Sequence, residues 1–445
     1  MTFPQPFIQM YKKLQTEDIK RLPNLVELVK SLEQENEKLV QEDNGWQNCK
    51  FISSPIPFTS RGFSGNDFLN DASPEKFIVV RTARGRHTLK PNLNRKKFLY
   101  RGQNAVYPHL LSSFSREDEN ITPFMSQDEI KKCRERSRRR HLVSNLKLEE
   151  FIDLLRSHPL FMMFDRGVVL APYLKPFFFN MNYYGLAQHY GFRTAVIDFT
   201  TDINVAAFFA CTKNSGDDIY TPITDIKRYP YGALYVHSII PDLTFKFLFS
   251  TIGLQLYPRS GAQKGVLFEE AQQANQFVAD KITNIYYFRH DPYCSTHFFK
   301  LMDSGKKLFP EDRIAQYAKQ IIHGNEISGN VFAQNLYSNQ EDFQINMNVL
   351  EENNINVNWG KRMSFTPNML HDLSNDLKNG LWEDFCNQID FGEPSIGHQL
   401  HDTLLSLPQN PLYSHYFKPK YYERLHAYDC NLHSRAIKNS KCKLN

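Results

Sequence analysis

The alternation of apolar and polar positions is clearest in the middle of the chain, where it predicts a helix, a sharp turn, a buried strand and a second helix in succession. Residues 183–190 place aromatic and apolar side chains near helical spacing, and Gly191 follows as a residue suited to the left-handed backbone at a helix end. Residues 194–197 are short, largely apolar and β-branched, which indicates a strand covered on both faces. Residues 205–211 are apolar on nearly every side, so we expect a buried helix there.

Polar side chains stand at the ends of these apolar elements. The hydroxyl of Thr200 or Thr201 is expected to cap the buried helix. Buried polar groups must be paired within the protein or used in its function. We therefore look for function among five polar residues of this stretch, which are Gln188, His189, Arg193, Asp198 and Thr200.

The same periodicities predict further elements on either side. Helices are expected within residues 1–45, where Leu25, Val29, Leu32 and Leu39 form a stripe, and over 146–164, 310–325, 346–354, 368–388 and 396–406. Strands are expected over 77–81, 98–103, 231–237 and 282–288, with a short strand after Gln263. We expect the N-terminal helix to pack on the body of the protein, in preference to acting as a dimerisation arm. Residues 421–445 are expected to form an extended terminus.

These elements predict an α+β fold with a mixed central β-sheet, flanking helices, an N-terminal helix and a helical C-terminal appendix. At 445 residues the chain is long enough for two or three domains. We expect an N-terminal helical arm at 1–45, the main domain at 46–310, and a mostly helical region with an irregular basic tail at 311–445.

The composition indicates the kind of interior, partner and compartment to expect. Its 13% of aromatic residues predict a well-filled interior, and its net charge of +5 permits a nucleotide or nucleic-acid partner without requiring one. The seven cysteines are scattered without a Cys-x-x-Cys pair, which fits a cytoplasmic protein better than a disulfide or zinc framework. We expect no signal peptide and no membrane partner, since no run approaches the roughly 18 apolar residues that a spanning helix needs.

Two further segments carry candidate chemistry. The strand at 98–103 delivers Arg101 toward the interior, where its guanidinium either locks two strands by pairing with a carboxylate such as Asp198 or grips a phosphate or carboxylate of a ligand. Residues 131–141 hold seven cations and one acid, a pattern suited to nucleic-acid phosphates. Because no aromatic residue interleaves that run, we favour a solvated helix face over a nucleic-acid contact.

Three blocks resemble the FRG domain family, named for a Phe/Tyr-Arg-Gly triplet. The triplet occurs as Tyr100-Arg101-Gly102, the long central signature covers 186–200 and continues at 205–210, and a third block begins at Arg259 and includes Ala262-Gln263. Order and spacing agree with the family, and the resemblance spans about 95 to 270. Arg193 stands where the family usually has Pro, and Phe199 where it usually has Trp.

The layout of an early Arg, a central helix–strand junction and a late Gln is also similar to ADP-ribosyltransferases, although no Gln-x-Glu or Glu-x-Glu pair occurs in the third block. This resemblance implies an NAD-using transferase or NAD glycohydrolase that acts as a toxin or defence effector, with NAD as substrate and no bound cofactor or metal. The catalytic candidates are His189, Asp198 and Gln263. The substrate-binding candidates are Arg101, Gln103, Gln188, Arg193, Thr200 and Arg259.

Each role has a structural alternative. Asp198, or failing it Glu269, is the candidate anion beside an oxocarbenium-like centre, but Asp198 also suits a carboxylate at a helix entry. His189 is equally well a satisfied core histidine, and Gln263 an amide that bridges strands. Two other functions stay open: a nucleic-acid-processing protein, for which the sequence shows no metal or phosphate-loop motif, and a non-enzymatic module that senses a nucleotide-like ligand and binds a protein partner.

Overall fold

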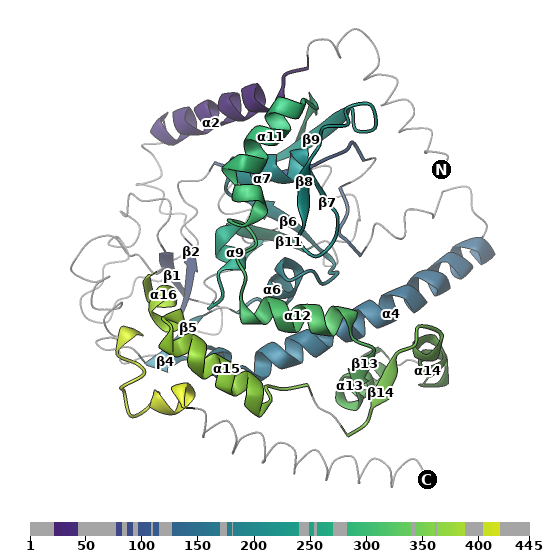
Figure 1. Ribbon diagram of the computed structural model, residues 1–445, viewed down its shortest axis with the longest axis vertical. Coiled ribbons are helices and arrows are strands. Elements are labelled where there is room, and N and C mark those ends of the chain that lie inside the picture. Colours follow the sequence, from purple (N-terminus) through teal and green to yellow (C-terminus); the bar gives the residue numbers. More distant parts are fainter. Residues whose placement is uncertain are drawn as a thin grey trace.

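The computed structural model describes residues 22–42, 77–81, 87–91, 97–107, 110–114, 127–169, 176–179, 181–239, 249–252, 256–269, 283–339, 343–360, 363–387 and 404–418, and the account below is confined to them. Their centre is a six-stranded sheet in the order β10 (Phe249–Thr251), β11 (Gly265–Glu269), β6 (Val196–Thr200), β3 (Phe98–Gln103), β9 (Tyr231–Ser238) and β12 (Asn284–Arg289) (Figure 1). Every neighbouring pair in this sheet is antiparallel.

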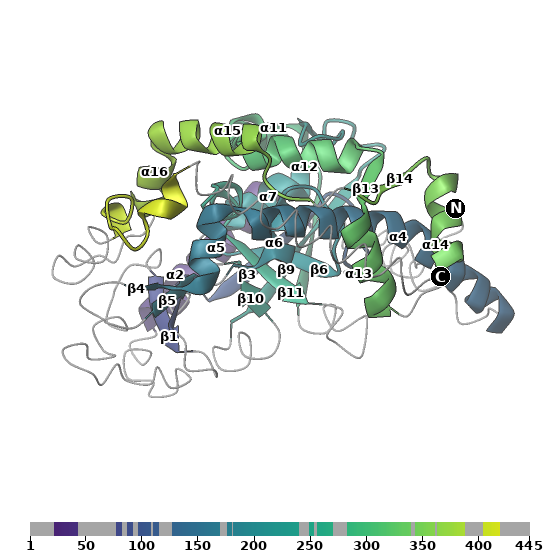
Figure 2. The same cartoon turned by 90° about the horizontal axis from the view of Figure 1, so that it is seen from below.

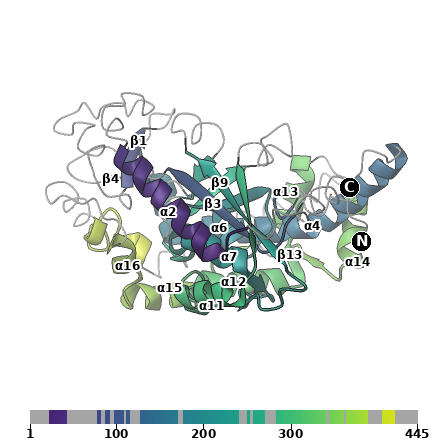
Figure 3. The ribbon, with the colours of Figure 1, turned by 90° about the horizontal axis from the view of Figure 1, so that it is seen from above.

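Helices cover one face of this sheet. The buried helix α7 (Ile203–Cys211) lies against β3, and α11 (Pro292–Leu301) and α2 (Leu25–Glu42) pack around it (Figure 3). The apolar stripe of α2 is buried in the same cluster as Tyr100 and Val236 of the sheet. The preferred interpretation of the N-terminal helix, packing on the body, is thus confirmed.

A second apolar cluster joins the helices before β6 to the C-terminal helices. The long helix α4 (Gln127–Ser157) continues into α5 (Pro159–Arg166), and both pack with α6 (Tyr183–His189), α12 (Arg313–His323), α15 (Pro367–Lys378), α16 (Leu381–Asn387) and the 3-10 turn η7 (Ser414–Phe417) (Figure 2). A third cluster packs α13 (Gly329–Asn339), α14 (Phe343–Glu352), and the parallel strands β13 (Glu326–Ser328) and β14 (Asn356–Asn358) on α4. The helical C-terminal region is therefore continuous with the body.

Two small sheets complete the described residues. One has the order β1 (Phe77–Arg81), β2 (His87–Pro91), β5 (Pro176–Phe179), β4 (Val168–Val169), with a parallel β2–β5 pair. The other pairs β7 (Thr212–Asn214) with β8 (Tyr220–Pro222), and a short helix α9 (Arg259–Ala262) precedes β11.

The α+β class is confirmed, with an antiparallel central sheet where we expected a mixed one. Among the described residues, parallel strand pairs occur in the smaller sheets, as β2–β5 and β13–β14. The helix expected at 368–388 is two, because Gly380 takes a left-handed backbone (φ +103°) between α15 and α16. The segment at 146–164 is likewise divided, with Pro159 opening α5. Residues 388–403 and 419–445 lie outside the described residues, and the three domain boundaries stay predictions.

Candidate functional site

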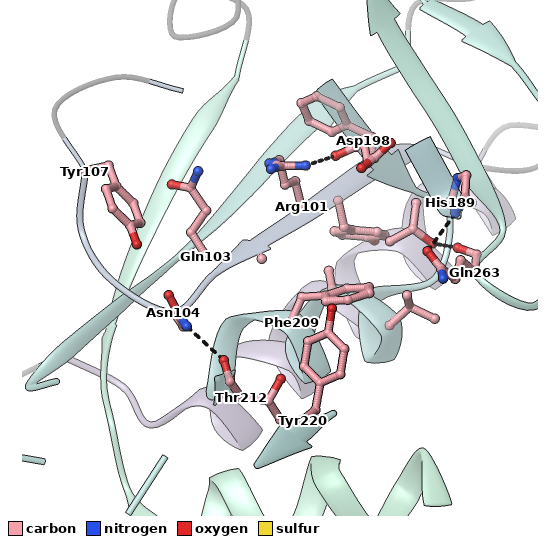
Figure 4. A pocket seen from close by; sticks show the side chains of 16 residues that line it. Arg101, Gln103, Asn104, Tyr107, His189, Asp198, Phe209, Thr212, Tyr220 and Gln263 are labelled. Carbon is pink, nitrogen blue, oxygen red and sulfur yellow. Dashed lines mark hydrogen bonds between the residues drawn. The ribbon is translucent and has the colours of Figure 1, made fainter. Parts of the chain in front are cut away.

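A cavity of about 300 Å³ lies between the second half of β3 and the second half of β6 (Figure 4). This volume falls at the lower end of the range for small-molecule sites. Its polar lining is Arg101, Gln103, Asn104, His189, Asp198, Thr200, Thr212 and Gln263, and its aromatic lining is Tyr100, Tyr107, Phe199, Phe209 and Tyr220. Residues as far apart in sequence as Arg101 and Gln263, which are separated by 162 positions, therefore meet around one space.

The cavity exists because β3 and β6 separate after a single paired position. Their register contains only Tyr100 opposite Thr200, whereas β3 continues to pair with β9 as far as Gln103. Arg101 bridges the gap that results, and its Nη1 donates to the backbone carbonyl of Asp198 at 2.7 Å. Arg101 therefore does link the two strands, as one alternative expected, but its partner is the backbone carbonyl of Asp198 and not the carboxylate.

Gly102 lets α7 close the bottom of this space. A β-carbon at position 102 would stand 1.9 Å from the carbonyl oxygen of Ala206 and 2.7 Å from the amide nitrogen of Ala210. Only a residue without a side chain allows the helix to approach the strand this closely. The glycine of the Tyr-Arg-Gly triplet therefore positions Ala206 and Phe209, two residues of α7 that line the cavity.

Asp198 presents one carboxylate oxygen to the protein and leaves the other without a partner. Gln188 on α6 donates its side-chain amide to Oδ2, and the Gln188 carbonyl accepts from the hydroxyl of Thr194. Oδ1 is buried and has no hydrogen-bond partner. The helix-entry alternative does not describe this carboxylate, because the N-cap of α7 is Asp202, whose side chain accepts from the amide of Asn204 at 2.9 Å. Thr200 and Thr201, our expected caps, do not fill that position.

His189 is buried at the end of α6 with its ring held by Gln263. The distance between Nδ1 and Gln263 Oε1 is 2.8 Å, and the Gln263 amide nitrogen donates to the carbonyl of Leu308 at 3.0 Å. Burial lowers the pKa of His189, against the opposing charge of Asp198 and the hydrogen bond with Gln263. The other ring nitrogen, Nε2, is buried without a hydrogen-bond partner.

Two further features accompany this histidine. A β-carbon at Gly265 would lie 2.7 Å from His189 Nε2, so the imidazole packs this closely on the strand only because position 265 has no side chain. Gln103, at the opposite end of the cavity, has a buried side-chain oxygen without a partner (Figure 4). Thr200 is placed differently: its hydroxyl donates to the backbone carbonyl of Gln263 at 2.8 Å, so it also joins β6 to the turn that carries the amide.

Three predicted site residues do not line the cavity. Arg259 is buried behind it, where Nη1 pairs with Asp218 at 2.7 Å and the guanidinium lies 5.0 Å from the centre of the Tyr190 ring. Arg193 is exposed, and Gln188 reaches the site only through Asp198. The prediction that Arg101 and Arg259 together hold phosphates therefore finds only Arg101 at the cavity, because the nearby Asp218 draws the Arg259 side chain away.

Sequence reasoning did not select several lining residues. Asn104 donates to the carbonyl of Thr212 at 2.9 Å and joins the end of β3 to the end of α7. Tyr107 stands 42% exposed at the rim, and Phe209 and Tyr220 form an edge-to-face pair with ring centres 5.8 Å apart. Tyr107 could have been selected from the sequence, because it closely follows the Tyr-Arg-Gly triplet. Tyr220 could not, because it lies on a strand with no distinguishing pattern.

Three further points concern a metal ion, a membrane and nucleic acid. Within the described residues, no group of three or more His, Cys, Asp or Glu side chains is placed to hold a metal ion. A search of the helices in those same residues found none with the length and apolarity to cross a bilayer. The basic run 131–141 lies on α4, but the side chains of 127–140 are outside the description, so the nucleic-acid contact stays a prediction.

Fold and site together define an α+β protein whose antiparallel sheet opens into a pocket with unsatisfied polar atoms. Residues 96–219 match the family model of the FRG domain, so the chain carries an FRG domain. The match includes β3, α6, β6 and α7 but ends before Gln263. Searches of the curated proteins and of the solved structures found no significant match. The similarity to ADP-ribosyltransferases gains no support from these comparisons.

Proposed function

We propose that the FRG pocket binds the ribosyl part of a nucleotide, with NAD as the leading candidate, and breaks the bond at its anomeric carbon. The observation that carries this proposal is that three residues lining the cavity each have a buried polar atom without a hydrogen-bond partner: Asp198 Oδ1, His189 Nε2 and Gln103 Oε1. A buried polar atom without a partner costs about 1–3 kcal/mol. A ligand that satisfies these atoms recovers that energy on binding.

The chemistry of these atoms indicates what the ligand offers. A carboxylate oxygen and an amide oxygen accept hydrogen bonds, and His189 Nε2 also accepts when Nδ1 carries the proton. A group rich in hydroxyl donors, such as ribose, complements all three. Arg101 supplies a cation at the cavity for a phosphate, and the rings of Phe209 and Tyr220 supply apolar surface for a base or nicotinamide.

The proposed reaction uses Asp198 as the anion beside the reacting carbon. The bond between the nicotinamide nitrogen and C1′ breaks, and its electron pair leaves with nicotinamide, which becomes neutral. The Asp198 carboxylate stabilises the positive charge that develops on C1′. Water, or a nucleophilic group of an acceptor protein, then adds to C1′ and transfers its proton to His189 Nε2. Water gives an NAD glycohydrolase and a protein acceptor gives an ADP-ribosyltransferase.

A cytoplasmic location and a role as a toxin or defence effector belong to this proposal as well. Cytoplasm holds NAD, and the cysteines Cys211, Cys294 and Cys386 are free and buried, which suits a reducing compartment. Depletion of NAD by this reaction would be the basis of the proposed effector role. Arg259 was expected to bind the ligand, but here it supports the position of His189. Its Nη1 lies 3.4 Å from the backbone carbonyl oxygen of that residue.

The test is release of nicotinamide from NAD by the purified full-length chain. We expect turnover that falls at least a hundredfold in Asp198→Asn, which keeps the size of the side chain and removes its charge. Asp384→Asn makes the same chemical change on the exposed face of α16 and should match the wild type. Absence of nicotinamide at all enzyme concentrations, or equal turnover in Asp198→Asn, would refute the reaction.

Calorimetric titration with NAD and with ADP-ribose separates an enzyme from a binding module. Saturable binding of both ligands without turnover, weakened at least tenfold in Gln103→Leu, would support the non-enzymatic alternative. The failure of both ligands to bind would refute the nucleotide proposal itself. The two assays therefore distinguish loss of the chemical step from loss of the ligand.

A further inference from the structure

Gln263 was expected to act in catalysis, but its contacts indicate another task. Both polar atoms of its amide are already engaged by protein: Oε1 faces His189 Nδ1 at 2.8 Å, and Nε2 donates to the carbonyl of Leu308 at 3.0 Å. Its backbone carbonyl is also engaged, by the hydroxyl of Thr200. The residue is buried, so no part of the amide remains for a ligand.

The direction of these bonds fixes the proton on the histidine. A carbonyl acceptor at Leu308 requires the NH₂ end of the Gln263 amide to point toward it. Oε1 then faces His189, and because that oxygen only accepts, Nδ1 must carry the hydrogen. Burial lowers the pKa of His189, which favours the neutral imidazole. Nε2 is then left with an unshared lone pair and no hydrogen-bond partner within the protein.

We infer that Gln263 is a positioning residue that holds His189 as the Nδ1–H tautomer, so that Nε2 accepts a hydrogen bond from the ligand. The site thereby selects a hydroxyl or amine donor, and rejects at this point a group that only accepts. This inference rests on the proposed function for the identity of the ligand, but the tautomer itself is a property of the ligand-free chain.

Nitrogen-15 NMR of histidine-labelled, ligand-free protein reads the tautomer directly, and His189→Gln identifies the resonances. We expect a protonated Nδ1 and an unprotonated Nε2 in the wild type. Gln263→Leu removes the acceptor and should move the population toward the Nε2–H form. Thr200→Val serves as the matched control, because it removes a hydrogen bond to the Gln263 backbone, leaves the side-chain amide in place, and should keep Nδ1–H.

A second variant covers the event that Gln263→Leu does not fold. Gln263→Glu retains an acceptor for Nδ1–H, so it should keep the wild-type tautomer and raise the pKa of His189 through its negative charge. An Nε2–H form in the wild type, or an unchanged Nδ1–H form in Gln263→Leu, would overturn the inference. Neither result depends on nicotinamide release, so failure of this inference and failure of the proposed reaction are separately visible.

Discussion

Replacing Gly102 with Ala tests the idea that the pocket depends on the contact between β3 and α7. The new β-carbon would stand 1.9 Å from the Ala206 oxygen, whereas β-carbons essentially never approach another heavy atom closer than 3.0 Å. The helix must therefore retreat by at least 1.1 Å, the difference between these distances. Because both nearest obstacles are backbone atoms, no side chain can rotate to relieve the clash.

The free energy of unfolding should fall accordingly. Overpacking a core typically costs about 1–3 kcal/mol, and a clash with backbone belongs at the upper end, so we expect about 3 kcal/mol for Gly102→Ala. That is a large part of the about 5–15 kcal/mol by which proteins are stable. Urea unfolding followed by circular dichroism measures the loss. The same retreat should also weaken ligand binding, because α7 carries Ala206 and Phe209 into the cavity.

Gly360→Ala is the matched control. At position 360 the nearest atom to an added β-carbon is Asn358 Oδ1 at 3.7 Å, an ordinary contact, so the unfolding free energy should stay within about 0.5 kcal/mol of the wild type. If Gly102→Ala is equally close to the wild type, α7 does not rest on β3 as described. The account of how the triplet glycine shapes the pocket would then be wrong.

Three further predictions concern stability. Burial lowers the pKa of His158 to about 3, below the value near 6.5 of an unfolded chain, so the unfolded state binds the proton first and stability is lost as pH falls below 6.5. The contribution of His158 at pH 5 should be about 2 kcal/mol, in addition to that of other buried histidines such as His189. Unfolding measured at pH 7 and pH 5 should therefore show a loss about 2 kcal/mol smaller in His158→Phe than in the wild type, and an unchanged loss in the exposed-site variant His371→Gln. Arg259→Met should lower the free energy of unfolding by about 3 kcal/mol, because it leaves the Asp218 carboxylate without its partner. Adding Asp218→Asn should recover part of that loss, and equal stability of the single and double variants would contradict the ion pair. Asp202→Ala should cost about 1 kcal/mol in thermal unfolding if that carboxylate caps α7, and a change below 0.3 kcal/mol would contradict the cap.

Local signals gave the most reliable expectations. Gly191 takes the left-handed backbone (φ +91°) expected after α6, because that conformation depends on the residue itself and its immediate neighbours. The strands at 77–81 and 98–103 and the apolar helix after Asp202 also follow from short-range patterns. Element ends were less certain: the strand expected at 194–197 is β6, which begins at Val196 and continues to Thr200.

Side-chain partners were harder to foresee, since distant segments decide them. Arg259 was expected to contact the ligand, but it meets Asp218, which lies 41 positions earlier on a turn whose path the sequence does not reveal. The same holds for Gln263, whose role is set by a carbonyl at Leu308. Arg193 departs from the family pattern and is exposed, so the departure from the usual Pro was informative.

The lining of the pocket includes Tyr220 and Gln263, which lie outside the matched segment 96–219, and this bears on any attempt to isolate the domain. Within the central sheet that segment supplies only β3 and β6, while β9 and β11, which flank them, come from later in the chain. An excised fragment with those limits would expose two strand edges in need of hydrogen-bonding partners, a known route to aggregation. It would also lack the amide that orients the histidine. Expression trials should therefore retain the polypeptide at least through Leu308.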